Sequence, residues 1–255
     1  MSKLLEGKKA LILGIANRWS LAYAIAQAFS REGASLILTY LNDRFKPALE
    51  DLANGLNVAS LLPCDVTREE QLADLSSALK SMGQLDAVVH SLAFANREDL
   101  SRPFVETPRS GFLLAQEVSA YSLVAVARAA APAMTAGGSL TTLTYIGSTR
   151  VVPNYNVMGV AKASLEAATR YLSSEMGPQK IRVNAISAGP VKTASARAVK
   201  DFSTILDVVA SRAPLRHNTD PAEVADTAVF LASDLGRGVT GNVLFVDSGM
   251  QIMGL

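Results

Sequence analysis

A tyrosine and a lysine lie seven residues apart in the run Tyr155-Asn-Val-Met-Gly-Val-Ala-Lys162. If this run opens a helix, both side chains return to nearly the same face, roughly 10 Å apart along the axis. A ribose and its nicotinamide fit across that gap, with Lys162 on the ribose hydroxyls and Tyr155 near the reacting carbon. The lysine charge would favour a polarised or ionising phenol, which donates a hydrogen bond to a carbonyl oxygen as negative charge develops on it. The spacing alone fits equally well an aromatic at a helix entry and a charge on the surface.

A glycine after the first predicted strand supplies a second candidate site. In Gly14-Ile-Ala-Asn-Arg-Trp-Ser20-Leu-Ala22, backbone N–H groups and a helix N-terminus could face a pyrophosphate. Of the dinucleotide-binding pattern GxGxxG only Gly14 remains, while Ser20 and Ala22 are small enough to let the helix approach cofactor and sheet. An ordinary strand-to-helix turn, with Ser20 as the helix cap, explains the same residues.

The end of the second predicted strand bears on the choice of cofactor. NAD sites commonly carry an acid about 20 residues past the glycines, on the ribose hydroxyls. Leu41 occupies that position, so the acid is missing. Arg44 and Lys46 could hold a 2′-phosphate, or simply begin a solvated helix. Because no basic residue lies at the strand tip, the sequence favours NADH and leaves NADPH open.

Two further strand ends, Cys64-Asp65-Val66 and His90-Ser91-Leu92, are expected at the same edge of the sheet, where ligands bind. Asp65 could accept a hydrogen bond from an adenine amino group, or cap the helix that opens near Thr67. Leu92 could pack beside the cofactor. His90 ends a buried strand and is interpreted as a satisfied core histidine rather than an acid–base catalyst, and His217 as a surface residue.

Strand-like and helix-like patterns alternate along the whole chain and must position these side chains. The predicted strands are apolar on both faces, and amphipathic helices separate them. This alternation predicts an α/β protein with a single-domain doubly wound Rossmann fold, a seven-stranded parallel sheet with helices on both faces. The strands are expected at 8–13, 36–39, 58–62, 87–90, 140–145, 181–186 and 243–246, and the helices at 20–31, 47–54, 69–81, 112–134, 158–176, 201–211 and 221–233.

Residues 1–255 are expected to form one dinucleotide-binding and catalytic domain, because no repeat, low-complexity tract or linker divides the chain. One stretch, 191–214, combines small residues with Phe202, Leu206 and Val209. It is predicted to be a substrate lid within that domain.

The composition excludes several classes of protein. With 24 basic and 23 acidic side chains the net charge is +1, so a nucleic-acid surface is not indicated. Charged residues make up 18% of the chain, against about 25% in typical domains, which suggests that part of the surface is buried between subunits. Apolar runs such as 10–15 fall far short of the ~20 residues of a membrane helix, and the N-terminal residues do not form a signal-peptide core. The single Cys64 fits a reducing compartment, so the predicted location is the cytoplasm.

Together these motifs resemble one family, the enoyl-acyl-carrier-protein reductases of type II fatty-acid synthesis, a divergent branch of the short-chain dehydrogenases/reductases. Ordinary members of that superfamily have Tyr-x3-Lys, but Gly159 lies four residues after Tyr155, and the six-residue gap before Lys162 is the enoyl-reductase variant. The resemblance runs from residue 8 to 249 and rests on Gly14-x5-Ser20-x-Ala22, Cys64-Asp65-Val66, Tyr145, and the runs 153–166 and 182–190.

The resemblance implies NAD(P)H-dependent reduction of the trans-2 double bond of an enoyl thioester on acyl carrier protein, in fatty-acid elongation. It further implies hydride transfer to the β-carbon, an enolate stabilised by Tyr155, Lys162 on the nicotinamide ribose, a homotetramer, and neither a metal site nor a membrane insertion. Tyr145, Tyr155 and Lys162 are the expected catalytic residues, and Ala95, Tyr145 and Tyr155 the substrate contacts. The cofactor would be held by Gly14, Ser20, Leu21, Leu41, Asp65, Val66, Leu92, Lys162, Val191, Lys192, Thr193, Ala194 and Ser195.

Two alternative functions differ from enoyl reduction in the chemistry that they require. Another short-chain carbonyl reductase would need Tyr-x3-Lys and a catalytic serine farther from the tyrosine than Ser148, which lies seven residues before Tyr155. A non-catalytic dinucleotide sensor would keep the fold and lose the chemistry, whereas Tyr155 and Lys162 are both present.

Overall fold

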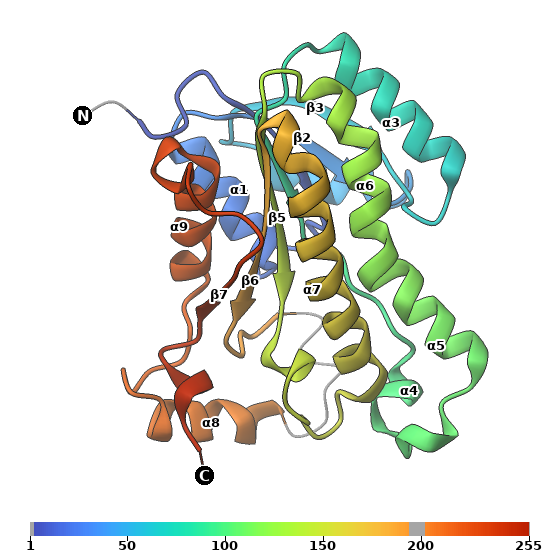
Figure 1. Ribbon diagram of the computed structural model, residues 1–255, viewed down its shortest axis with the longest axis vertical. Helices are drawn as coiled ribbons and strands as arrows, with labels where there is room; N and C mark the ends of the chain where they lie inside the picture. The colour runs from blue at the N-terminus through green and yellow to red at the C-terminus, as the bar shows by residue number, and fades with distance from the viewer. Residues whose placement is uncertain (1–2, 194–201, 255) are drawn as a thin grey trace.

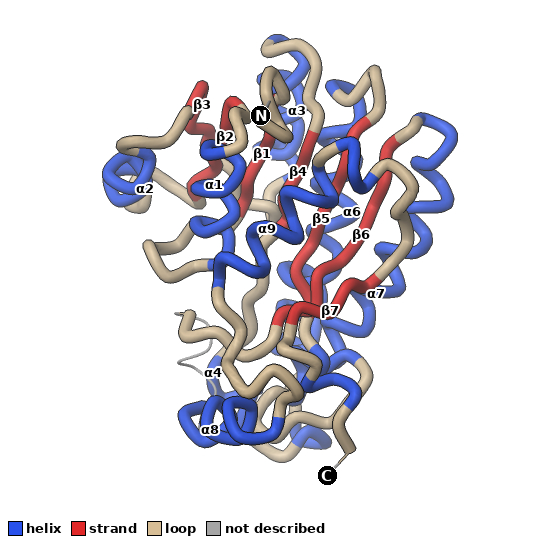
Figure 2. The backbone as a smooth tube through the Cα atoms, turned by 90° about the vertical axis from the view of Figure 1, so that its left-hand side faces the viewer, coloured by secondary structure: helices blue, strands red, loops and turns tan. Residues whose placement is uncertain are grey.

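The strands form one parallel sheet whose order places the ends of β1 and β4 side by side. The computed structural model describes residues 3–193 and 202–254. Within them, seven strands follow the order β3-β2-β1-β4-β5-β6-β7 (part of the sheet is labelled in Figure 1 and all of it in Figure 2). The order reverses between β1 and β4, the switch point at which doubly wound sheets bind ligands. The strands are β1 (Lys9–Leu13), β2 (Ser35–Tyr40), β3 (Val58–Pro63), β4 (Ala87–His90), β5 (Gly138–Thr144), β6 (Ile181–Ala188) and β7 (Val243–Val246).

Helices cover both faces of this sheet. Figure 2 shows α1 and α9 on one face and α6 and α7 on the other. Each layer buries its own apolar cluster against the strands, with Ile25 and Val224 on the first face and Leu123 and Leu165 on the second. The helices are α1 (Leu21–Arg31), α2 (Lys46–Ala53), α3 (Glu69–Ser81), α4 (Arg97–Ser101), α5 (Arg109–Gln116), α6 (Ser122–Ala130), α7 (Asn156–Met176), α8 (Phe202–Arg212) and α9 (Pro221–Ala232).

The expectation of one α-helix over 112–134 is wrong. The helical segment begins earlier, at Arg109, and a π turn, Glu117–Tyr121, separates α5 from α6. Length and composition alone would allow the segment Arg109–Ala133 to cross a membrane, but half of its most apolar window is buried inside the fold, as in a core helix. Ser119 in the π turn binds the backbone of Phe94 in the loop after β4, and Ser122 at the start of α6 binds His90 at the end of β4. Hydrophobic periodicity does not encode these interactions.

The short helix α4 is also absent from the expected elements. It has five residues, too few to show a helical period in the sequence. Its buried Asp99 accepts a hydrogen bond from the side chain of Asn96 at 3.0 Å and lies 3.1 Å from the guanidinium of Arg102. All other predicted boundaries agree with the structure to within two residues.

Candidate active site

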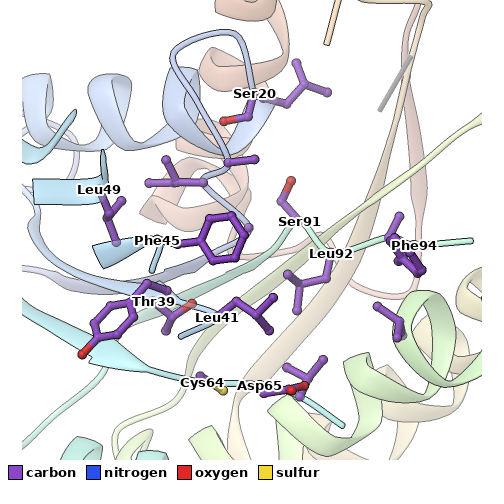
Figure 3. Close-up of a pocket in the computed structure, with 18 of the residues that line it drawn as sticks. Ser20, Thr39, Leu41, Phe45, Leu49, Cys64, Asp65, Ser91, Leu92 and Phe94 are labelled. Atoms are coloured by element: carbon purple, nitrogen blue, oxygen red, sulfur yellow. The ribbon is translucent and has the colours of Figure 1, made fainter. Parts of the chain in front are cut away.

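A cavity of about 630 Å³ lies at the carboxyl ends of the strands that meet at the switch point. Its volume is in the range of small-molecule and cofactor sites. Figure 3 shows Leu41, Phe45 and Leu92 around its middle, with Ser20 toward one end and Asp65 toward the other. Nine of the predicted cofactor-binding residues line it: Gly14, Ser20, Leu21, Leu41, Asp65, Val66, Leu92, Lys162 and Thr193.

Four predicted cofactor-binding residues are not among those that line the cavity. Val191 is buried and Lys192 is exposed, while Ala194 and Ser195 lie outside the described residues. The predicted lid, 191–214, is described only in part, and its helix α8 buries Leu206 and Val209. The lid and all of the predicted cofactor contacts, including those at residues that line the cavity, stay predictions.

Sequence reasoning missed one wall of the cavity. Phe45, Ala48, Leu49 and Leu52 line it from α2 and the residue before that helix. Their helical spacing indicates a buried face, but the spacing does not say whether that face meets the core or a ligand cavity. The wall that these four side chains form is apolar. Lys162, on α7, is the only basic side chain among the described residues that line the cavity.

Gly14, at the end of β1, allows the ends of β1 and β4 to lie close together beside the cavity. Its φ of +98° is one that side-chain-bearing residues rarely adopt, and a Cβ here would overlap the carbonyl group of Ser91 after β4. Only a glycine lets the two strand ends approach so closely while the following turn leads into α1. A bare backbone next to a helix N-terminus is the arrangement that cradles a pyrophosphate. The residues present therefore fit a dinucleotide.

Ser20 and Asp65 act on their local turns as well as lining the cavity. Ser20 occupies the N-cap position of α1, as the alternative interpretation expects, but its hydroxyl donates to the carbonyl of Asn17 at 2.7 Å and makes no capping hydrogen bond to the helix. One carboxylate oxygen of Asp65 accepts from the N–H and the hydroxyl of Thr67, at 3.0 and 2.7 Å. Asp65 thus closes the turn before α3 while it faces the cavity.

Lys162 extends from α7 into the interior. Its side chain is buried, and its Nζ donates to the carbonyl of Leu143 on β5 at 2.7 Å. Burial lowers the pKa of Lys162 to about 8, and the charge of Glu166 opposes that shift. Because Lys162 also lines the cavity, the interpretation of it as a surface charge is wrong.

Tyr155 and Tyr145 form an edge-to-face pair between β5 and α7. Their ring centroids are 5.1 Å apart and their planes make an angle of 68°. The turn between them is tight: a Cβ on Gly147 would lie 2.6 Å from the Tyr155 ring, and a Cβ on Gly159 would lie 2.8 Å from the carbonyl oxygen of Gly147. Both tyrosines are therefore held by a close contact between this turn and the start of α7.

The expected substrate contacts lie on the same side of the molecule. Ala95 and Tyr155 both pack against a small buried cluster that includes Leu100, Ala115 and Ala161. The cluster joins α4, α5 and α7. Ala95, Tyr145 and Tyr155 are not among the described residues that line the cavity, so these substrate contacts stay predictions.

The expected ionising tendency of the Tyr155 phenol is wrong. Burial raises the pKa of Tyr155 above its ordinary value, and the neighbouring Tyr145 adds to the rise. The ammonium group of Lys162 is hydrogen-bonded to a carbonyl group instead. The phenol stays neutral, which is the form that donates a hydrogen bond.

His90 is a satisfied core histidine, as the sequence indicates. It is fully buried, with Nδ1 2.9 Å from the hydroxyl of Thr142 and Nε2 2.8 Å from the hydroxyl of Ser122. Burial, followed by the charge of Lys162, lowers the pKa of His90 to about 3. His217, by contrast, is exposed.

This depressed pKa predicts acid sensitivity of the fold. In the unfolded chain His90 is protonated below about pH 6.5, whereas in the folded chain it stays neutral down to about pH 3. The free energy of unfolding should therefore fall by roughly 1.4 kcal/mol per pH unit as the pH drops below 6.5, relative to His90→Gln, which does not titrate. Urea unfolding of both proteins between pH 7.5 and 4.5 measures the difference. If the free energies of unfolding of wild type and His90→Gln changed with pH in parallel, His90 would not be the source of the acid sensitivity.

Comparison with known proteins decides the family. A family model described as enoyl-(acyl carrier protein) reductase matches residues 14–251. The chain belongs to the enoyl-acyl-carrier-protein reductase family. It is 52% identical over 255 residues to the NADH enoyl-acyl-carrier-protein reductase FabI of Bacillus cereus, covering 99% of this chain and 100% of the relative. It is 50% identical to the NADPH enzyme of that name from Staphylococcus aureus MRSA252, covering 97% and 98% of the two chains.

Solved structures of enoyl-acyl-carrier-protein reductases have the same fold. The Bacillus cereus reductase with NADP+ and indole naphthyridinone superposes with a TM-score of 0.98 at 53% identity, covering 99% of this chain and 100% of that one. The NADH reductase of Aquifex aeolicus VF5 superposes with a TM-score of 0.95 at 42% identity, covering 99% of both chains. The predicted family, fold class and nicotinamide-dependent reductase chemistry are confirmed.

Proposed function

We propose that the chain reduces the trans-2 double bond of enoyl thioesters carried on acyl carrier protein, in fatty-acid elongation. The supporting observation is the placement of Lys162 inside the dinucleotide cavity with Tyr155 at the start of the same helix. The two residues span the distance between a ribose and a reacting carbon. Family membership identifies the reaction, and this spacing supports the roles proposed for Tyr155 and Lys162.

The reduced nicotinamide supplies the hydride, which the β-carbon of the substrate accepts. Tyr155 donates a hydrogen bond to the thioester carbonyl oxygen, where negative charge develops as the enolate forms. Protonation of the α-carbon then gives the saturated product. Lys162 holds the hydroxyls of the nicotinamide ribose, Tyr145 supports the Tyr155 ring, and Ala95 lines the acyl site. Residues 191–214 are proposed to act as the substrate lid.

NADH is the preferred reductant in this proposal. The cavity wall formed by α2 is apolar, and Leu41 stands where a charged side chain would recognise the ribose. A 2′-phosphate would meet no basic side chain there among the described lining residues, because Arg44 and Lys46 are not part of the lining. Relatives at 52% and 50% identity carry NADH and NADPH in their names, so overall identity does not settle the preference.

We further propose that the chain works as a homotetramer in the cytoplasm, without a nucleic-acid or membrane partner. The charged fraction of 18% and the net charge of +1 support this. Among the exposed large apolar side chains, Leu113, Tyr121, Val160 and Tyr171 lie along α5 to α7, and Phe245, Ile252 and Met253 lie in β7 and after it. Two such surfaces suit a closed assembly with two kinds of contact.

The proposed reaction is tested by the loss of reduced-nicotinamide absorbance with crotonyl thioester, using NADH and NADPH in parallel. We expect turnover with crotonyl thioester and NADH, slower turnover with NADPH, and none with acetoacetyl thioester. Oxidation with the acetoacetyl substrate alone would assign the chain to carbonyl reduction. Tight NADH binding without turnover of any thioester, including one on intact carrier protein, would indicate a sensor.

A further inference from the structure

Glu166 is a buried acid to which the proposed reaction gives no role. It lies on α7 one turn after Lys162, and only 7% of its surface is exposed. The hydroxyl of Thr144 donates to its Oε1 at 2.7 Å. Lys162 donates from its Nζ to the backbone carbonyl oxygen of Leu143, the preceding residue of β5, at 2.7 Å. Two consecutive residues of β5 therefore fix an acid and a base that lie one turn apart on α7.

Burial of a carboxylate at this position lowers the free energy of unfolding unless a favourable interaction with the charge compensates for it. Removing a charged group from water is unfavourable, and an apolar side chain of similar size would pack in the same space. Residues four apart on a helix are neighbours on one face, so the negative charge lies close to Lys162. Burial lowers the pKa of Lys162 to about 8, and Glu166 acts against that fall. Removal of the Glu166 charge would let Lys162 lose its proton nearer neutral pH.

Other charged groups near Lys162 do not replace Glu166. His90 at the end of β4 feels the charge of Lys162 but stays neutral, and burial keeps Tyr145 and Tyr155 neutral as well. Charged side chains on the other described elements that contact α7 are paired elsewhere or exposed: Asp99 with Arg102, Arg128 with Glu69, Arg182 with the carbonyl of Leu231, and the exposed Arg97, Glu98, Arg109, Glu117, Arg150 and Lys180.

We propose that Glu166 is a positioning residue for Lys162: its negative charge, held in place by Thr144, favours the ammonium form of Lys162 that binds the ribose hydroxyls of the cofactor. The role rests on the proposed contact between Lys162 and the cofactor. The charge of Glu166 acts on binding through Lys162 and does not require Glu166 to touch either substrate or cofactor.

The test is the pH dependence of NADH affinity in Glu166→Gln, measured by NADH fluorescence between pH 6.5 and 9.5. Gln keeps the size of the side chain and an oxygen for Thr144, and removes only the charge. The wild-type affinity should fall around pH 8, where Lys162 loses its proton. In Glu166→Gln this midpoint should move to lower pH by on the order of one unit. Glu166→Met carries the same expectation with a side chain of similar size.

Two further variants separate the possible causes. Thr144→Val removes the hydrogen bond but keeps the charge, so its midpoint should stay closer to the wild-type value than that of Glu166→Gln. Lys162→Met should bind NADH weakly and show no transition near pH 8. If Lys162→Met kept the wild-type affinity and transition, the proposed role of Lys162 itself would fail.

The inference about Glu166 fails separately if Lys162→Met loses the transition while Glu166→Gln keeps the wild-type midpoint. It also fails if Thr144→Val moves the midpoint as far as Glu166→Gln does, because packing would then be responsible. If both neutral variants at position 166 fail to fold while Thr144→Val folds, Glu166 has a structural role and the proposal is overturned.

Discussion

Tyr155→Phe is expected to lose on the order of a hundredfold or more in kcat with crotonyl thioester, with a much smaller change in the affinity for NADH. The phenol is neutral in this environment, so its contribution is a donated hydrogen bond. That bond strengthens as the thioester oxygen gains negative charge, and an interaction made mainly in the transition state affects kcat more than binding. Phe preserves the ring that packs against Tyr145.

Tyr145→Phe is the matched control, because it removes the hydroxyl from the other ring of the same pair. If Tyr145 only packs, this variant should keep kcat within a few fold of wild type. A comparable loss in both variants would place the two hydroxyls in one catalytic hydrogen-bond network. A Tyr155→Phe enzyme within threefold of wild type would remove Tyr155 from the mechanism.

Gly14→Ala is expected to weaken NADH binding at least tenfold and to lower the free energy of unfolding. Two costs combine. The positive φ strains any side-chain-bearing residue by roughly 1–3 kcal/mol, and the new methyl group overlaps the carbonyl group of Ser91. Relief requires the ends of β1 and β4 to separate, which displaces the backbone that faces the pyrophosphate. A loss of about 1.4 kcal/mol in binding corresponds to tenfold in affinity.

Gly83→Ala separates the backbone strain of a positive φ from the steric overlap with a neighbour. Gly83 has a similar φ of +82°, but a Cβ there would have no neighbour within 4 Å. This variant should lose about 1 kcal/mol of stability and keep the wild-type affinity for NADH. Titration calorimetry and urea unfolding of the two variants supply both quantities. Equal NADH affinity in Gly14→Ala and wild type would exclude the pyrophosphate from this turn.

The architecture was predictable because its signals are local and repeated. Seven apolar runs of strand length alternate with amphipathic segments, and a buried parallel sheet is the arrangement that accommodates such a pattern. The cofactor cavity followed from topology, since ligands of doubly wound sheets bind at the carboxyl ends of strands. Gly14, Leu41, Asp65 and Leu92 come from four different strand ends and could be grouped on that basis alone.

The features that escaped prediction depend on contacts between distant segments. The π turn at Glu117–Tyr121 is compatible with the same hydrophobic period as an α-helix, so the sequence does not distinguish them. The direction of the Tyr155 pKa shift depends on how deeply the ring is buried and on where the Lys162 ammonium is bound. Spacing along a helix brings Tyr155 and Lys162 together but says nothing of the carbonyl of Leu143.

The π turn has a consequence for insertions and deletions. A π turn holds one residue more than the α-helical turn that it replaces. Ser119 lies within this turn, and its hydroxyl accepts a hydrogen bond from the N–H of Phe94 at 2.9 Å, while Ser122, the first residue of α6, lies 2.8 Å from Nε2 of His90. Deletion of a single residue between Glu117 and Tyr121 would convert the π turn into an α-helical turn and move Ser119 relative to Phe94, while α5 and α6 would keep nearly the same relative orientation. The length of this segment, and not only its composition, is therefore under constraint.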